Sequence, residues 1–282
     1  MNTQTLLLDS LNTRWDTYKT ELKNCRDDFS EDAVHDFRVA VRRLLALLDL
    51  LRTLMRDAKV KKIRQTLKDQ LDNLDELRDT QVMLDDISQN ILEVPQLQPL
   101  EEYLQRREKK LMRAARREIK TLKIVSLSRR MVKLRKNIEA VSLADLDSGL
   151  LPAVDNAFAS ATQLYAQVDP AQSATIHRLR IAFKKFRYVI EAIHPILDEF
   201  PIGSLKKMQA YQTSMGEIQD MDVALQMVAN FEKHAPAEYD PKPIRSYYKE
   251  RQTLAISRYI EDKGEVFTFW RTMPDQSFLK ET

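Results

Sequence analysis

The stretch that decides the fold is "VHDFRVAVRRLLALLDLL", residues 34–51. Apolar residues recur in it at spacings of three and four, the pattern of a helix that buries one face. His35, Arg38 and Arg42 lie within about 60° of one another around such a helix. Asp49 follows further along the same line. The stretch therefore predicts an amphipathic helix with a largely cationic polar face.

The same design returns later in the chain as "IHRLRIAFKKFRYVIEAI", residues 176–193. His177, Arg180, Lys184 and Glu191 take the four directions that His, Arg, Arg and Asp take in the first copy. Each copy is followed by a second matched segment, "LDELRDTQVML" at 74–84 and "MGEIQDMDVAL" at 215–225. Two matched helices in the same order predict duplicated halves related by a pseudo-twofold axis.

The composition agrees with a helical protein. Only four glycines occur in 282 residues, and 43% of the residues are hydrophobic, which is enough for a large core. We predict a single all-α domain, residues 1–282, that divides at the break "DSGLLP", 147–152, into a first half of about 1–146 and a second of about 147–282. The predicted helices span residues 3–24, 31–56, 59–89, 97–124, 127–140, 152–168, 173–198, 203–234 and 242–262.

Several classes of protein are excluded by what the chain lacks. It has no run of about 18 apolar residues and its first residues do not resemble a secretory signal, so we expect a cytoplasmic protein without a membrane partner. Its single cysteine, Cys25, excludes an internal disulfide and a thiolate metal cluster. We expect no cofactor and no resident metal.

The net charge of +3 hides a strongly uneven distribution. Residues 106–136 hold fourteen Lys or Arg and two acids, a net charge of +12 that leaves −9 for the rest of the chain. Like charges four residues apart on a helix repel, so an unbroken cationic stripe predicts an anionic partner. We name this set the basic stripe: Arg106, Lys110, Arg113, Arg117 and Lys120.

Phosphate suits these side chains better than carboxylate. Guanidinium groups bind phosphate through two parallel hydrogen bonds, and lysine adds a point charge. Few aromatic residues are interleaved with the cations, which disfavours single-stranded nucleic acid because its bases need stacking platforms. A phosphate polymer without bases, or the backbone of a duplex, remains.

The paired "VHDFRVAVRRL" and "IHRLRIAFKKFRY" segments, each followed by "LDELRDTQV" or "MGEIQDMDV", resemble the CHAD domain, the conserved histidine α-helical domain. The resemblance implies a compact bundle of long antiparallel helices in two pseudo-symmetric four-helix halves. It also implies a basic groove that binds inorganic polyphosphate, and association with polyphosphate granules. The motif positions carried over are His35, Arg38, Arg42, Arg43, His177, Arg180, Lys184, Lys185 and Arg187.

The resemblance has two qualifications. Lys184 and Lys185 replace the arginines of the first half, which keeps the charge but weakens the bidentate grip. The triphosphate tunnel enzyme fused to some members carries an E-x-E-x-K signature that this chain lacks, so we expect a binding domain and no enzyme. We expect one groove lined by both matched helices and the basic stripe. His35 and His177 are either ligand contacts or hydrogen-bond partners within the bundle.

Three rival functions follow from other features. Glu191-Ala-Ile-His194 has the Glu-x-x-His spacing of a di-iron bundle, but Arg52 stands where a second histidine is needed. The acids of the second matched segments suit a metal-dependent phosphate hydrolase. We favour instead that Asp79 and Asp220 pair with cations of the matched helices. A nucleic-acid binder has no recognisable motif here, and we expect only weak, non-specific binding of that kind.

Overall fold

The computed structural model describes residues 2–55, 58–197, 200–201, 203–235 and 239–271. All regular elements in these ranges are helical, which confirms the all-α fold. The α-helices are α1 (Thr3–Asp27), α2 (Glu31–Met55), α3 (Ala58–Asn90), α4 (Gln98–Thr121), α5 (Val125–Ala140), α6 (Leu143–Tyr165), α7 (Ser173–Ile193), α8 (Ser204–Glu232) and α9 (Lys242–Asp262). Three short 3-10 helices accompany them, η1 (Pro95–Leu97), η2 (His194–Ile196) and η3 (Lys263–Thr268).

Most predicted helices are confirmed to within a few residues, but the predicted break at 147–152 is wrong. These residues lie inside α6, which begins at Leu143 behind the cap Ser142 and contains Pro152. Leu146, Leu150 and Val154 of α6 are fully buried. Tertiary packing of that apolar face outweighs the poor helix propensity of the glycine and the proline.

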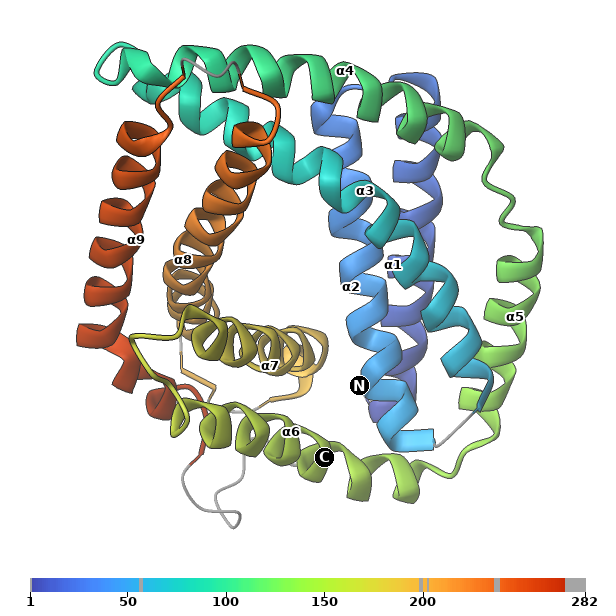
Figure 1. Ribbon diagram of the computed structural model, residues 1–282. Helices are drawn as coiled ribbons and strands as arrows, with labels where there is room; N and C mark the ends of the chain where they lie inside the picture. The colour runs from blue at the N-terminus through green and yellow to red at the C-terminus, as the bar shows by residue number, and fades with distance from the viewer. Residues whose placement is uncertain (1, 56–57, 198–199, 202, 236–238, 272–282) are drawn as a thin grey trace.

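The two predicted four-helix halves are present as α1–α4 and α6–α9, with α5 between them. In each half every helix packs against the next one, α1 on α2, α2 on α3 and α3 on α4, and likewise from α6 to α9. The halves meet where α2 packs against α7 and α6, where α3 packs against α8, and through smaller contacts of α1 and α4. Figure 1 shows α4 and α6 along opposite edges of the molecule, with α8 and α9 on one side and α1, α2 and α5 on the other.

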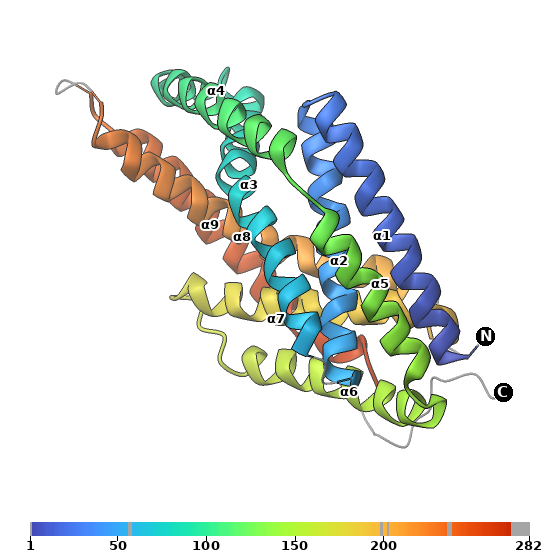
Figure 2. The same cartoon turned by 90° about the vertical axis from the view of Figure 1, so that its right-hand side faces the viewer.

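The linking helix α5 closes the first half from outside. It packs against α1 and α3, and the side view in Figure 2 shows it running beside α1. Its apolar positions are those expected for one buried stripe, with Leu127, Met131, Leu134 and Ile138 buried. The basic segment predicted at 106–136 is therefore divided between two helices, α4 and α5.

The matched helices α2 and α7 supply the centre of the core. Leu44 and Leu47 of α2, and Phe183 and Phe186 of α7, are fully buried in one apolar cluster that runs through both halves. Burying each such side chain contributes about 2 kcal/mol. The apolar faces of both helices are thus fixed against the core, and this fixes the direction of their cationic faces.

No helix in the described part of the chain is both long enough and apolar enough to cross a membrane.

Candidate polyanion-binding site

Cations from both halves converge where α2 packs against α7. Lys184 lies at the centre, and its pKa is lowered to about 7 by burial and by four guanidinium groups. Two of these come from α2 and two from α7. We call the group the cation cluster: Arg38, Arg42, Arg180, Lys184 and Arg187. The pseudo-twofold packing of α2 on α7 therefore builds one site out of both copies of the motif.

Arg38 is the most buried member, with 2% of its surface exposed. Its Nη2 atom donates to Oδ1 of Asp75 at 2.7 Å, and its Nη1 atom donates to the carbonyl of Leu71 at 3.3 Å. Both partners lie on α3. Arg38 thus has its charge balanced within the protein and ties α2 to α3.

Arg42 and Lys184 are half-buried and carry no such counter-charge. Burial and the charge of Arg38 lower the pKa of the Arg42 guanidinium. Within the described part of the chain neither side chain forms an ion pair. An uncompensated pair of partly buried cations is costly in the absence of an anion.

Arg187 is held by its own neighbours. It is 6% exposed, its Nε atom donates to Gln212 at 2.9 Å, and it forms an ion pair with Glu191. Its guanidinium lies 4.6 Å from the ring centroid of Tyr188, over which Lys184 also lies. Arg187 contributes charge to the cluster, while its Nε and Nη1 atoms already have partners within the protein.

Two carboxylates stand beside the cluster on the helices α3 and α8, which pack against each other. Asp79 of α3 and Asp220 of α8 are matched positions, and burial raises the pKa of both. The charge of Asp75 also raises the pKa of Asp79, and the charge of Asp79 raises the pKa of Asp220. Arg180 lowers the pKa of Asp220. The prediction that Asp79 and Asp220 pair with cations of the matched helices is wrong, because neither acid forms an ion pair among the described residues. Arg38 pairs with Asp75 instead.

The pocket next to the carboxylates is acidic and does not suit a polyanion. It has a volume of about 320 Å³ and lies between α3, α8 and α9. Its charged lining is dominated by acids, with two arginines of α9 opposite: Asp79, Asp85, Asp86, Glu217, Asp220, Arg251 and Arg258. The cation cluster, and not this pocket, is therefore the candidate site for an anion, and the acids bound it on one side.

The matched cations, the matched acids and the helix order agree with one family of proteins. The CHAD domain model matches residues 10–229. This chain belongs to the CHAD domain family. A search of curated proteins finds no match.

Solved structures show the same fold for this CHAD domain. The crystal structure of the CHAD domain from the plant Ricinus communis is 17% identical and superposes with a TM-score of 0.68, covering 95% of this chain and 90% of that one. PptA from Streptomyces chartreusis is 15% identical with a TM-score of 0.60, covering 95% of this chain and 98% of that one. At such low identity the likeness is one of fold.

The two motif histidines of this CHAD domain occupy different environments. His35 is exposed at the start of α2. His177 is half-buried beside Gln219 and Asp222, and burial together with Arg180 lowers its pKa. Its Nδ1 atom is buried and receives no hydrogen bond from any described residue. His177 is therefore neutral at pH 7 and adds no positive charge to the cluster.

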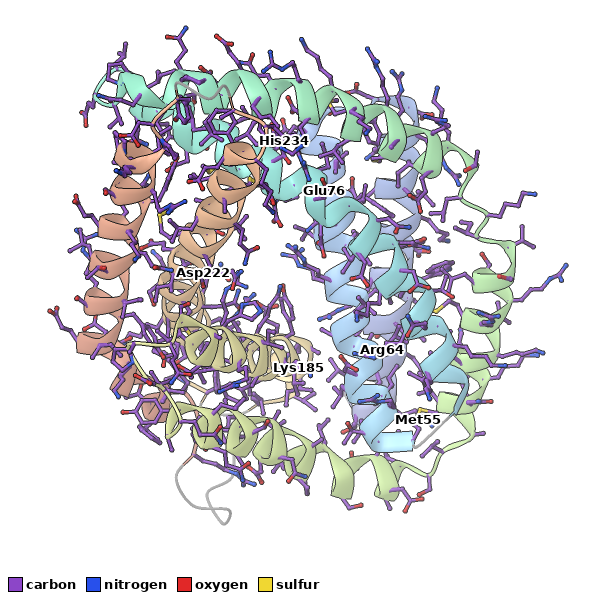
Figure 3. The ribbon with its side chains drawn as sticks, viewed as in Figure 1. Met55, Arg64, Glu76, Lys185, Asp222 and His234 are labelled. Carbon is purple, nitrogen blue, oxygen red and sulfur yellow. The ribbon has the colours of Figure 1, made fainter. Side chains whose placement is uncertain are left out.

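Two further motif residues of the CHAD domain point away from the cluster. Arg43 is exposed, and its carbonyl accepts from Nη1 of Arg14 on α1 at 2.7 Å. Lys185 is exposed at the contact between α6 and α7, where Figure 3 labels it, and lines a separate hollow there. Neighbouring positions on a helix differ by about 100°, so each of these residues faces a different side from its cluster neighbour.

The basic stripe lies apart from the cation cluster. All five of its residues are exposed, while the opposite face of α4 buries Leu100, Leu104, Ala115 and Ile119. Figure 3 shows nitrogen-tipped side chains pointing outward along α4, and Glu76 of α3 lies beneath that helix. α4 thus turns its apolar face inward and its basic stripe outward, and a single groove lined by both sets stays a prediction.

Two residues near the site were missed by sequence reasoning. Arg14 of α1 lies next to Arg43, and burial lowers its pKa. Glu191 and Tyr188 are close enough to raise that pKa in part. Tyr188 supplies the ring beneath Lys184 and Arg187. A cation on α1 has no matched partner in the repeat, so the duplication could not reveal it.

The residues proposed for a di-iron site are not arranged as metal ligands. Glu191, its only predicted glutamate ligand, accepts a hydrogen bond from Arg187. Over the residues that the structure describes, no group of three or more His, Cys, Asp or Glu side chains is placed to hold a metal ion.

Proposed function

We propose that this CHAD domain binds inorganic polyphosphate at the cation cluster, without catalysing a reaction on it. The observation that carries the proposal is a surplus of positive charge at the contact between the halves. Arg42, Arg180 and Lys184 converge there, and no described carboxylate forms an ion pair with any of them. A chain of phosphates would neutralise all three at once.

The chemistry of the cluster favours a polymer of phosphate over a single anion. Arginine offers paired donors that match phosphate oxygens, and the charges come from helices of both halves, so a chain can pass from one to the other. Asp79 and Asp220 repel an anion on their side and confine the chain to the cations. The family resemblance carries the same implication.

The basic stripe is proposed as a second contact for long chains. It lies outside the cluster and is fully hydrated, so its contribution is electrostatic and sensitive to salt. A polymer long enough to reach both surfaces gains from each, whereas a short one occupies the cluster alone. Such a protein would serve as a scaffold or targeting module at polyphosphate granules in the cytoplasm.

The test is a titration of the full chain with medium-chain polyphosphate at two salt concentrations. Duplex DNA serves as competitor, and free phosphate is assayed in the same tubes. We expect binding that weakens steeply with salt, that DNA does not displace at comparable phosphate concentration, and that releases no phosphate. Phosphate release would replace the proposal with a hydrolase, and displacement by DNA would replace it with a nucleic-acid binder.

A matched pair of variants locates the site. Arg42→Gln with Lys184→Gln removes two positive charges from the cluster. Lys61→Gln with Lys62→Gln removes two from exposed positions near the start of α3. We expect the first pair to lower affinity by about 100-fold and the second to leave it within about twofold. Equal losses from both would mean that the protein attracts polyphosphate through its overall charge only.

A further inference from the structure

The two halves differ at one position that decides whether a matched arginine has an ion-pair partner on the next helix. Arg38 and Arg180 correspond at an offset of 142 along the chain. The helices that follow, α3 and α8, correspond at an offset of 141, which pairs Asp75 with Gly216. The acid that balances the arginine in the first half is thus a glycine in the second.

The structure places both arginines in the same way against these positions. In the first half Nη2 of Arg38 lies 2.7 Å from Oδ1 of Asp75. In the second half the guanidinium of Arg180 lies over the backbone of α8, where a Cβ atom added to Gly216 would be 3.5 Å from Nη2 and 3.6 Å from Nε. A carboxylate at 216 would therefore stand beside Arg180 as Asp75 stands beside Arg38.

Neither the backbone nor the packing requires a glycine at 216. Gly203 is the only glycine of the described residues with a positive φ, and Gly216 lies inside α8. The added Cβ would make ordinary van der Waals contacts, so alanine would fit. Glycine inside a helix is less favourable than alanine. The presence of glycine at 216 must therefore have a cause other than backbone geometry or packing.

Arg180 has no ion-pair partner among the described residues as a result, and its charge reaches their carboxylates only by lowering the pKa of Asp220. It forms no ion pair or hydrogen bond with any residue that the structure describes, and its Nε atom is buried without an acceptor. A buried donor without a partner destabilises a protein. An anionic ligand that supplied the acceptor would remove that penalty on binding.

We propose that the halves are unequal in function: Arg180 of the second half holds the phosphate, and Gly216 is the specificity-determining residue that keeps Arg180 free for it. Arg38 is the structural copy, neutralised by Asp75. This inference rests on the proposed binding of polyphosphate. It adds which half carries the contact and which residue controls it.

The first experiment compares Gly216→Asp with Gly216→Asn in polyphosphate titrations of the full chain. The two side chains have nearly the same size, so their difference isolates the charge. We expect Gly216→Asp to lower affinity by about tenfold or more, and Gly216→Asn to change it by less than about threefold. Equal losses would overturn the inference, because bulk and not charge would then be responsible.

A second measurement needs no ligand. Urea unfolding of Gly216→Asp, Arg180→Gln and the double variant gives the coupling between the new carboxylate and Arg180. We expect a favourable coupling that Gly216→Asn does not show, and its absence would overturn the geometry of the inference.

The binding results separate the inference from the proposed function. If both the unaltered protein and Gly216→Asp bind polyphosphate normally, the inference is overturned and the proposed function stands. Failure of the unaltered protein to bind would overturn the proposed function, and the inference with it.

Discussion

Lys184 of α7 lies so close to Arg42 of α2 that, after burial, the Arg42 guanidinium is the largest influence lowering the lysine pKa. The two residues are matched positions of the repeat, 142 places apart in the chain. Packing α2 against α7 about the pseudo-twofold axis brings equivalent cations together, so the repulsion is a direct result of the duplication. The fold tolerates that repulsion at its centre, which is the physical basis for expecting an anion there.

Arg38→Ala and Arg180→Ala should separate structure from binding. Arg38→Ala removes the bonds to Asp75 and Leu71 and should lower the free energy of unfolding by about 2 kcal/mol. Arg180→Ala should leave the free energy of unfolding within about 1 kcal/mol and lower polyphosphate affinity by about tenfold.

Urea unfolding at fixed ionic strength is the suitable measurement for this pair, since guanidinium chloride would screen the cluster. Circular dichroism before unfolding gives the helix content. A stable Arg38→Ala protein with greatly weakened binding would reverse the assignment of the two arginines.

Charge removal on the basic stripe should affect long chains only. Arg113→Gln with Arg117→Gln leaves the buried face of α4 untouched, because both side chains are exposed. We expect the affinity for tripolyphosphate to stay the same and the affinity for long chains to fall by about tenfold, with a shallower dependence on salt. Affinities for both ligands at three salt concentrations test this. An equal loss for both would place the stripe within the primary site.

The sequence predicted the helices and their pairing because both depend on local and repeated patterns. Apolar periodicity marks each helix, and the two motif pairs mark the halves. The prediction from sequence failed at α6, where Gly149 and Pro152 suggested a break between helices. Gly149 faces Leu54 closely, with a Cβ added there lying 3.2 Å from Cδ2, and a contact between distant segments of this kind leaves no local signal.

The site was predictable in its residue types and less so in its contacts. Periodicity places Arg38 on the same face as Arg42, but the choice between Asp75 and Asp79 as its partner depends on how α3 is rotated against α2. Burial of Arg187 depends in the same way on Gln212 of α8. Rotation and depth of packing between helices are set by the whole core, so the sequence did not reveal them.

Pro152→Ala should stabilise the protein. Pro152 is exposed inside α6, where it removes one helical hydrogen bond. Its replacement should raise the free energy of unfolding by about 1–3 kcal/mol. Pro99 is the matched control because it lies in the first turn of α4, where proline costs little, so Pro99→Ala should give no gain. Thermal and urea unfolding of both variants test the expectation, and a gain from Pro99→Ala alone would contradict it.

Polyphosphate binding should take up a proton at Lys184. The pKa of this lysine is lowered to about 7, so near neutral pH it is only partly charged in the free protein. An anion next to it favours the charged form and raises its pKa. Between the free and the bound pKa, binding therefore adds a proton, and affinity should fall as pH rises above about 7.

Calorimetric titrations at pH 7.5–9 in two non-phosphate buffers of different ionisation enthalpy measure this uptake. The range avoids His177, whose pKa is lowered from its ordinary value of 6.5. Lys184→Arg is the matched control, because arginine keeps its charge over the whole range and should abolish both the proton uptake and the fall in affinity. Equal uptake by the unaltered protein and by Lys184→Arg would show that another group titrates, and a ligand that binds without any uptake would lie away from Lys184.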